Sequence, residues 1–159
     1  MITVVADTGV IISLAVINKL HLLHDIFGNV FIPQAVWSEL SVFIEKYPDI
    51  SRYFQNKVKN ITGINDLLLF ADEGEAEAII LCKEIKADYL IIDDKKGRNI
   101  AEELGISCIG ALGILYKAKK LGLITQLREE FISLTAHRRY YSKEIMNYIL
   151  QQANEKNIS

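Results

Sequence analysis

The chain alternates between two patterns of hydrophobic and polar positions. The first is a short run rich in Val, Ile and Tyr, with no regular exchange of apolar and polar residues. Such runs are typical of strands that are covered on both faces. We predict strands at 2–7 ("ITVVAD"), 29–32 ("NVFI"), 88–93 ("DYLIID") and 107–110 ("SCIG").

The second pattern is a longer segment with apolar residues at helical spacing. In "PQAVWSELSVFIEKY" (33–47), Pro33 suits a first helical position, and Val36, Leu40 and Phe43 share one helix face. Residues 9–26 predict two short helices, with a break near Asn18 or Leu20. Further helices are predicted at 74–87, 96–105 (closed by Gly105), 111–122, 125–134 and 143–155 (capped by Ser142).

Strands that alternate with helices predict right-handed crossovers and a parallel sheet. The expected fold is therefore a three-layer α/β/α sandwich, with ligand sites beyond the carboxyl ends of the strands. Residues 48–70 have no clear pattern, and "VKNITGI" within them fits either a short strand or a loop.

Composition narrows the class of protein without identifying it. The 159 residues fit one domain, half of them are apolar, and the net charge of −2 does not indicate nucleic-acid binding. Cys82 and Cys108 lack metal-ligand spacing and do not suggest a disulfide framework, so we expect reduced thiols and a cytoplasmic location. The apolar start has no basic leader, and no apolar run reaches membrane-spanning length.

Acidic residues stand where the predicted strands end and helices begin. Asp7 ends the first strand, and Asp93 and Asp94 end the third, so parallel strands would bring them to one edge of the sheet. Glu39 lies in the helix after the second strand, and Glu75 lies in the first turn of its helix. Carboxylates without His or Cys suit Mg²⁺ or Mn²⁺ and suit zinc poorly.

Each of these acids also has an ordinary structural interpretation. Asp72 and Glu75 have the spacing of a capping box, and Asp7 is a favourable cap for a helix that starts near Gly9. Glu39 fits an exposed surface position. The metal-site hypothesis depends on the joint placement of the acids and not on any one of them.

The stretch "DDKKGR" has the same ambiguity. Asp93 and Asp94 can form a turn that caps the next helix and pairs with Lys95 or Arg98. Alternatively, Lys95, Lys96 and Arg98 can contact a nucleic-acid backbone from the sheet edge. A solvated helix start is the other interpretation of these cations.

A second basic stretch lies near the end of the chain. "HRRYY" (137–141) offers the charges of Arg138 and Arg139 beside aromatic faces, a combination that suits single-stranded nucleic acid. The alternative is an exposed linker before the last helix.

Two stretches carry a resemblance to a known family. "VVADTGVIISLAVINKLHLLHDIFGNVFIPQAVWSEL" and "DEGEAEAIILCKEIKADYLIIDDKKGRNIAEELG" resemble the PIN domain, in a VapC-like branch long catalogued as of unknown function. The resemblance covers roughly residues 3–125. It implies a PIN-like core over 1–125, followed by a helical extension over 126–159 that packs on the same domain.

The resemblance also implies a site and its chemistry. Asp7 matches the first-strand acid, Glu39 the helix acid and Glu75 the third acid, while the fourth is either Asp93 or Asp94. Thr8 matches the hydroxyl residue beside the first acid. The implied activity is that of an endoribonuclease that hydrolyses phosphodiester bonds with one or two Mg²⁺ or Mn²⁺ ions.

By the same resemblance, the expected substrate is single-stranded or structured RNA. A role as the toxin of a toxin–antitoxin pair, inhibited by a small antitoxin, and a homodimeric state are further expectations. Gly9 departs from the Ser or Asn of many relatives, which leaves a second hypothesis: a catalytically weak module that binds RNA or protein. A phosphorylatable receiver-like domain fits poorly, because the paired acids follow a late strand and Asp7 alone ends the first.

Overall fold

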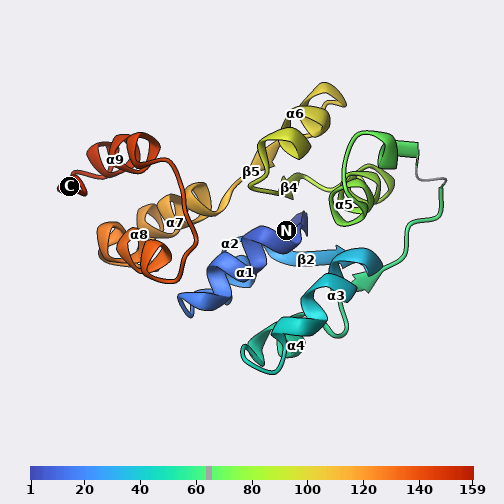
Figure 1. The fold of residues 1–159 in the computed structure, drawn as a ribbon, viewed down its shortest axis with the longest axis horizontal. Helices are drawn as coiled ribbons and strands as arrows, with labels where there is room; N and C mark the ends of the chain where they lie inside the picture. The colour runs from blue at the N-terminus through green and yellow to red at the C-terminus, as the bar shows by residue number, and fades with distance from the viewer. Residues whose placement is uncertain (64–65) are drawn as a thin grey trace.

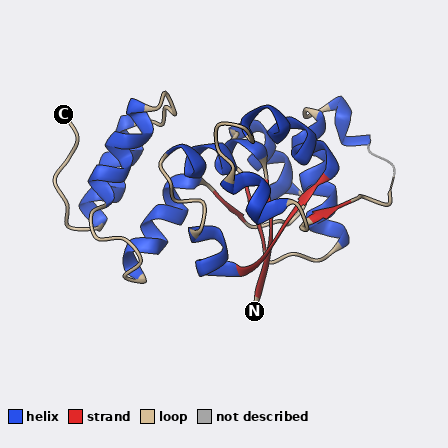
Figure 2. Cartoon of the chain, turned by 90° about the horizontal axis from the view of Figure 1, so that it is seen from below, coloured by secondary structure: helices blue, strands red, loops and turns tan. Residues whose placement is uncertain are grey.

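The computed structural model describes residues 1–63 and 66–159 and places a parallel sheet at the centre of the molecule. Within these residues, five strands form the sheet in the order β3-β2-β1-β4-β5, with β1 in the middle. Figure 2 shows the strands lying among helices. The strands are β1 (Ile2–Ala6), β2 (Gly28–Pro33), β3 (Val58–Lys59), β4 (Tyr89–Ile91) and β5 (Cys108–Ile109).

Helices connect the strands and continue after the last one (Figure 1). The α-helices are α1 (Thr8–Val16), α2 (Leu22–Phe27), α3 (Gln34–Leu40), α4 (Asp49–Phe54), α5 (Glu73–Glu84), α6 (Lys95–Glu103), α7 (Ala111–Lys120), α8 (Leu127–Ala136) and α9 (Lys143–Gln152). Short 3₁₀ turns lie at Ser41–Phe43 and Asp66–Leu69. None of the helices in the described ranges is long and apolar enough to cross a membrane.

The expected layered α/β architecture is confirmed. Successive residues of a strand point to opposite faces of a sheet. Val4 accordingly joins an apolar cluster with side chains of α1, α2, α7, α8 and α9, whereas Val5 joins a second cluster with side chains of α5 and α6. Both faces of the sheet are thus buried, which explains why the strands show no polar alternation.

The four strands expected from the sequence are confirmed, and most helices are found with shifts of a few residues at their ends. The break between the first two helices falls where Asn18 takes a positive φ of 58°. Gly105, at φ 81°, follows the end of α6, and Ser142 accepts a hydrogen bond from the Ile145 N–H at the start of α9. In the ambiguous "VKNITGI", Val58 and Lys59 form the edge strand β3, and Ile64 lies outside the described residues.

The helix predicted over 33–47 is wrong in its extent. Pro33 belongs to β2 and precedes the helix, which ends at Leu40 and gives way to a 3₁₀ turn. The Ser41 hydroxyl donates a hydrogen bond of 2.7 Å to the Ser38 carbonyl oxygen. Such local bonds compete with the helical ladder.

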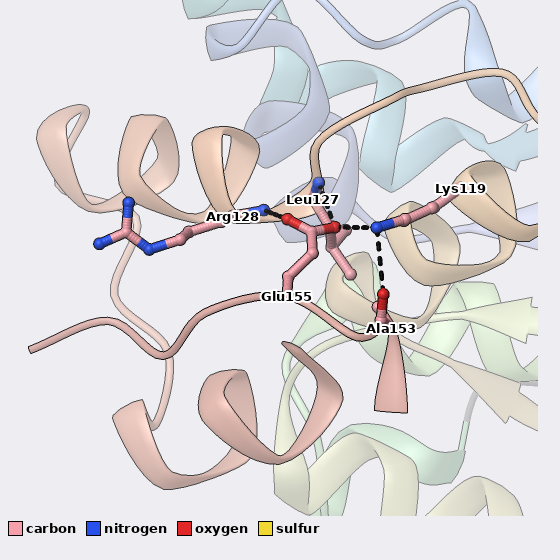
Figure 3. A network of polar contacts seen from close by, with 5 residues as sticks. All are labelled: Lys119, Leu127, Arg128, Ala153 and Glu155. Carbon is pink, nitrogen blue, oxygen red and sulfur yellow. Dashed lines mark hydrogen bonds and ion pairs between the residues drawn. The ribbon is translucent and has the colours of Figure 1, made fainter. Parts of the chain in front are cut away.

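The end of the chain is held by a polar network centred on Glu155 (Figure 3). The Glu155 carboxylate accepts hydrogen bonds from the backbone N–H groups of Leu127 (2.9 Å) and Arg128 (2.8 Å) and forms an ion pair with Lys119. Lys119 also donates to the Ala153 carbonyl oxygen at 3.2 Å. These contacts tie the residues that follow α9 to α7 and to the start of α8.

Candidate active site

The sheet topology brings β1 and β4 side by side at the point where the strand order reverses. From β1 the chain builds β2 and β3 on one side, and it later adds β4 and β5 on the other. The Asp7 N–H donates to the Ile91 carbonyl oxygen at 2.8 Å, which aligns the carboxyl ends of the two strands. In parallel α/β sheets this switch point is where ligands bind.

Asp7 follows β1 at this edge, and the residue is only 7% exposed. It occupies the residue before α1, but its carboxylate makes no capping hydrogen bond to that helix. The pKa of Asp7 is raised from 3.8 to about 7. Burial is the main cause, the Thr8 N–H acts against it, and the nearby acids Glu39, Asp72 and Asp94 add to the rise. The cap interpretation therefore does not account for this residue.

Glu39 reaches the same edge from α3. Its carboxylate accepts a hydrogen bond of 2.7 Å from the Thr8 hydroxyl, so the residue next to Asp7 positions it. On its other side it lies against α5, where a Cβ on Gly74 would stand 2.1 Å from Glu39 Oε1. Glycine at position 74 lets the carboxylate approach the first turn of α5 this closely.

Glu75 and Asp72 come from the start of α5. Asp72 accepts a hydrogen bond of 2.9 Å from the Glu75 N–H, which is one half of a capping box. The Glu75 carboxyl carbon would lie 3.6 Å from a Cβ on Gly97, at the start of α6. The pKa of Glu75 is raised to about 7, first by burial and then by Asp72, Asp94 and Asp7. The sequence pattern predicts only a capping role for Asp72, yet its charge also raises the pKa of both Asp7 and Glu75.

Asp94 completes the group from the start of α6. It accepts a hydrogen bond of 2.9 Å from the Gly97 N–H. A Cβ on Gly97 would stand 3.6 Å from both Asp94 Oδ2 and the Glu75 carboxyl carbon, so the two carboxyl groups flank one spot. We call Asp7, Glu39, Asp72, Glu75 and Asp94 the acidic cluster.

Asp93, the neighbour of Asp94, lies outside the acidic cluster. One of its carboxylate oxygens accepts from the Ala111 N–H at 2.9 Å, and the other accepts from the Tyr141 hydroxyl. The same hydroxyl lies 2.7 Å from Ser13 Oγ. Both oxygens of Asp93 are thus engaged in holding α7 and the loop before α9.

Gly9, the departure from the family pattern, lies beside the same loop. Arg139 donates to the Gly9 carbonyl oxygen and to Ser13 Oγ, each at 2.9 Å. A Cβ on Gly9 would stand 3.7 Å from the Arg139 guanidinium, so that guanidinium packs against the face of Gly9. Arg139 serves here as a structural contact to α1.

The other predicted basic residues line three different cavities. Lys95 and Lys96 are exposed and line a cavity that also contains Asp94. Arg98 lines a different cavity, with Asp93 and Tyr141. Arg138 is exposed and lies with Tyr140 beside Asp93.

The acidic cluster offers the oxygen donors that Mg²⁺ or Mn²⁺ prefers. In the described part of the chain, none of its five members forms an ion pair. The raised pKa values of Asp7 and Glu75 come first from burial and then from neighbouring acids, and a bound cation would offset both effects. Within residues 1–63 and 66–159, however, no three His, Cys, Asp or Glu side chains stand close enough to hold an ion together. The donors fit the ion in kind, and their side chains have to turn to coordinate it.

Comparison with protein-family models matches residues 3–155 to the family described as DUF3368: PIN domain. The match continues beyond residue 125 and includes α8 and α9. Comparisons with curated proteins and with solved structures gave no significant match. PIN domains are typically nucleases and usually bind Mg²⁺. With most of its length matched, and with five parallel strands flanked by helices, this chain belongs to the PIN-domain family.

Proposed function

We propose that the protein is a metal-dependent endoribonuclease whose site is the acidic cluster. The observation that carries the proposal is the environment of Asp7. Among the described residues, Asp7 is a buried carboxylate that forms no ion pair and has further acids nearby. Such a charge is costly unless a cation joins it. Family membership supports the nuclease class, and the arrangement at the switch point of the sheet supports this location.

Asp7, Glu75 and Asp94 would hold one or two Mg²⁺ or Mn²⁺ ions, with Glu39 and Asp72 beside them. When bound, such an ion supplies an activated water and stabilises negative charge on the scissile phosphate. The chain's own contribution is orientation. Thr8 fixes Glu39, the Gly97 N–H fixes Asp94, and the Glu75 N–H fixes Asp72, each through a hydrogen bond of 2.7–2.9 Å.

The finer biological role is part of the proposal. A VapC-like toxin would be inhibited by a small antitoxin that covers the acidic cluster, and the enzyme would act as a homodimer. Arrested growth of cells that express the wild type, but not Asp7→Asn, would support the toxin role. Light scattering of the purified chain would report the oligomeric state.

The direct test is cleavage of a mixed-sequence single-stranded RNA in Mg²⁺, Mn²⁺ or EDTA. We expect cleavage only with a metal ion, and a loss of at least about 100-fold in Asp7→Asn and Asp94→Asn, because each change removes a ligand worth several kcal/mol. Asp25→Asn, which changes an exposed acid of α2, serves as the matched control and should cleave like the wild type.

Calorimetric titration with Mn²⁺ distinguishes the two hypotheses. A nuclease with narrow substrate preference still binds the ion, and Asp7→Asn weakens that binding. If the wild type neither cleaves RNA nor binds Mn²⁺ more tightly than Asp7→Asn, the nuclease proposal is wrong and the catalytically weak binding module is favoured.

A further inference from the structure

A large cavity adjoins the acidic cluster along α6. Its volume is about 760 Å³, within the usual range for sites that take small molecules. It lies between α6 and the segment that leads into α5, and we call it the α6 groove. Its lining residues are Leu67, Phe70, Asp94, Lys95, Lys96, Asn99, Ile100, Glu103 and Leu104.

One wall of the groove is apolar and accessible. Phe70 is 57% exposed, and Leu104 is 40% exposed. An aromatic ring that stands this free of the core while lining a hollow is available to a flat ligand. Phe70 also stands two residues before Asp72, so the ring and the acidic cluster are close along the chain.

The polar groups on the rim of the groove differ between the start and the end of α6. At the helix start, Asp94 belongs to both the groove and the acidic cluster, and Lys95 and Lys96 follow it. Neither lysine forms an ion pair in the described residues. Asn99 adds an amide one turn further on. At the far end, Glu103 supplies a carboxylate acceptor beside Leu104.

We propose that the α6 groove binds one nucleoside of a single-stranded RNA, next to the phosphate that the acidic cluster cleaves. The base stacks on Phe70, Asn99 and Glu103 face its polar edge, and Lys95 and Lys96 contact the adjoining phosphates. The inference rests on the proposed nuclease function, because Asp94 joins the groove to that site.

The chemistry of the rim favours RNA over an apolar segment of a protein partner. Lys95 and Lys96, which form no ion pair with any residue that the structure describes, complement phosphate charge. An exposed aromatic ring is the usual platform for an unstacked base. An apolar peptide would use Phe70 and Leu104 but would leave the two lysines unused.

Binding can be measured without cleavage, by fluorescence anisotropy of a short fluorescein-labelled mixed-sequence RNA with the full chain in EDTA. Stacking on one aromatic side chain is worth about 5- to 150-fold in affinity. We expect Phe70→Ala to weaken RNA binding by that factor. Phe70→Tyr keeps an aromatic ring and should bind RNA like the wild type. Tyr148→Ala, at a residue of α9 that is 63% exposed, is the control and should change affinity less than twofold.

The lysines are tested by salt dependence. Each phosphate contact contributes about 0.7 to the slope of log affinity against log salt for single strands. Lys95→Ala and Lys96→Ala should each lower that slope by about this amount, whereas Lys117→Ala, an exposed lysine of α7, should leave it unchanged.

Unchanged RNA affinity in Phe70→Ala would overturn the proposal and leave the groove to a protein partner. If only the nuclease proposal is wrong, the experiments give a different result. RNA binding would then still depend on Phe70, while no metal ion would produce cleavage. Conversely, metal-dependent cleavage with unchanged KM and kcat in Phe70→Ala would overturn the groove alone.

Discussion

The acidic cluster and the Glu155 network are two groups of carboxylates at different parts of the molecule with opposite electrostatics. Glu155 is 13% exposed, and burial alone would raise its pKa. Hydrogen bonds from Lys119 and from the backbone of Arg128 and Leu127 outweigh burial and lower that pKa below 4.5. Asp7 is more deeply buried and faces other acids, so its pKa rises to about 7.

The difference shows what each region contributes to the protein. The Glu155 network gives its carboxylate enough donors to repay desolvation, so the charge stabilises the fold of the last helices. The acidic cluster leaves part of its charge unsatisfied, so it lowers stability in the absence of a ligand. Functional sites commonly retain such strain, because the missing interaction is the one that the ligand provides.

The largest expected effect comes from removing the charge of Asp7. The pKa of Asp7 in the folded chain, about 7, lies above its ordinary 3.8, so ionisation opposes folding. Stability is fully present below about pH 4 and is lost as pH rises through 7, by as much as about 4 kcal/mol. In EDTA at pH 8, Asp7→Asn should therefore be more stable than the wild type in urea unfolding.

The gain should shrink as the pH approaches 4, where Asp7 is protonated. Asp25→Asn should show no such dependence. An Asp7→Asn variant no more stable than the wild type at pH 8 would mean that the acidic cluster carries no strain, and the contrast with Glu155 would fail.

The second prediction concerns the Glu155 network. Glu155→Gln removes the charge that Lys119 faces and weakens two backbone contacts. We expect a loss of about 2 kcal/mol at pH 7, as for other charged hydrogen-bond partners. Because the pKa of Glu155 is lowered, its contribution is present above 4.5 and is lost as pH falls through the folded-state value.

Denaturant unfolding at pH 7 and pH 3 measures this loss. The difference between Glu155→Gln and the wild type should be much smaller at pH 3. Glu144→Gln, an exposed glutamate in the first turn of α9, is the control. Equal losses at both pH values would show that packing, and not charge, explains the network.

The third prediction applies the comparison to two adjacent residues, Asp93 and Asp94. Tyr141→Phe removes the hydroxyl that contacts Asp93 and Ser13, and it should cost about 1 kcal/mol of stability. Asp94→Asn should change stability less, since Asn also caps helices well, while it abolishes cleavage.

Thermal unfolding and the RNA cleavage assay separate these effects. Tyr140→Phe, at a residue that is 73% exposed, should change neither. If Tyr141→Phe abolished cleavage at unchanged stability, then Asp93 would belong to the catalytic site after all.

The smallest expected change in stability comes from Gly74→Ala. The added Cβ would displace the Glu39 carboxylate, which is exposed and can swing away from Thr8. Alanine favours the helix by up to about 1 kcal/mol, so stability should stay within that range while cleavage falls. Gly113→Ala, in α7, provides the matched control, and full activity in Gly74→Ala would show that Glu39 needs no fixed position.

Local sequence patterns predicted the presence of helices and strands better than the residues at which they end. Apolar runs indicated β1, β2, β4 and β5 correctly, because residues buried on both faces of a sheet must be apolar. The end of α3 was missed, because the helical spacing of apolar residues continues past Leu40, where the chain passes into a 3₁₀ turn and the Ser41 hydroxyl bonds to the Ser38 carbonyl oxygen. The edge strand β3 could not be separated from a loop, because it pairs with β2 over only two residues.

The sequence by itself determined the fold class, the edge of the sheet where the acids gather and the type of ion that they suit. These follow from short-range periodicity and from the fact that parallel strands end on one side. Only the tertiary structure decided which of the adjacent residues Asp93 and Asp94 lies with the other acids. Asp93 binds a tyrosine 48 residues away, and Asp72 joins the acids because α5 and α6 begin side by side. Such contacts depend on how helices pack across the sheet. That packing involves residues far apart in the chain, so it cannot be inferred from two adjacent carboxylates in the sequence.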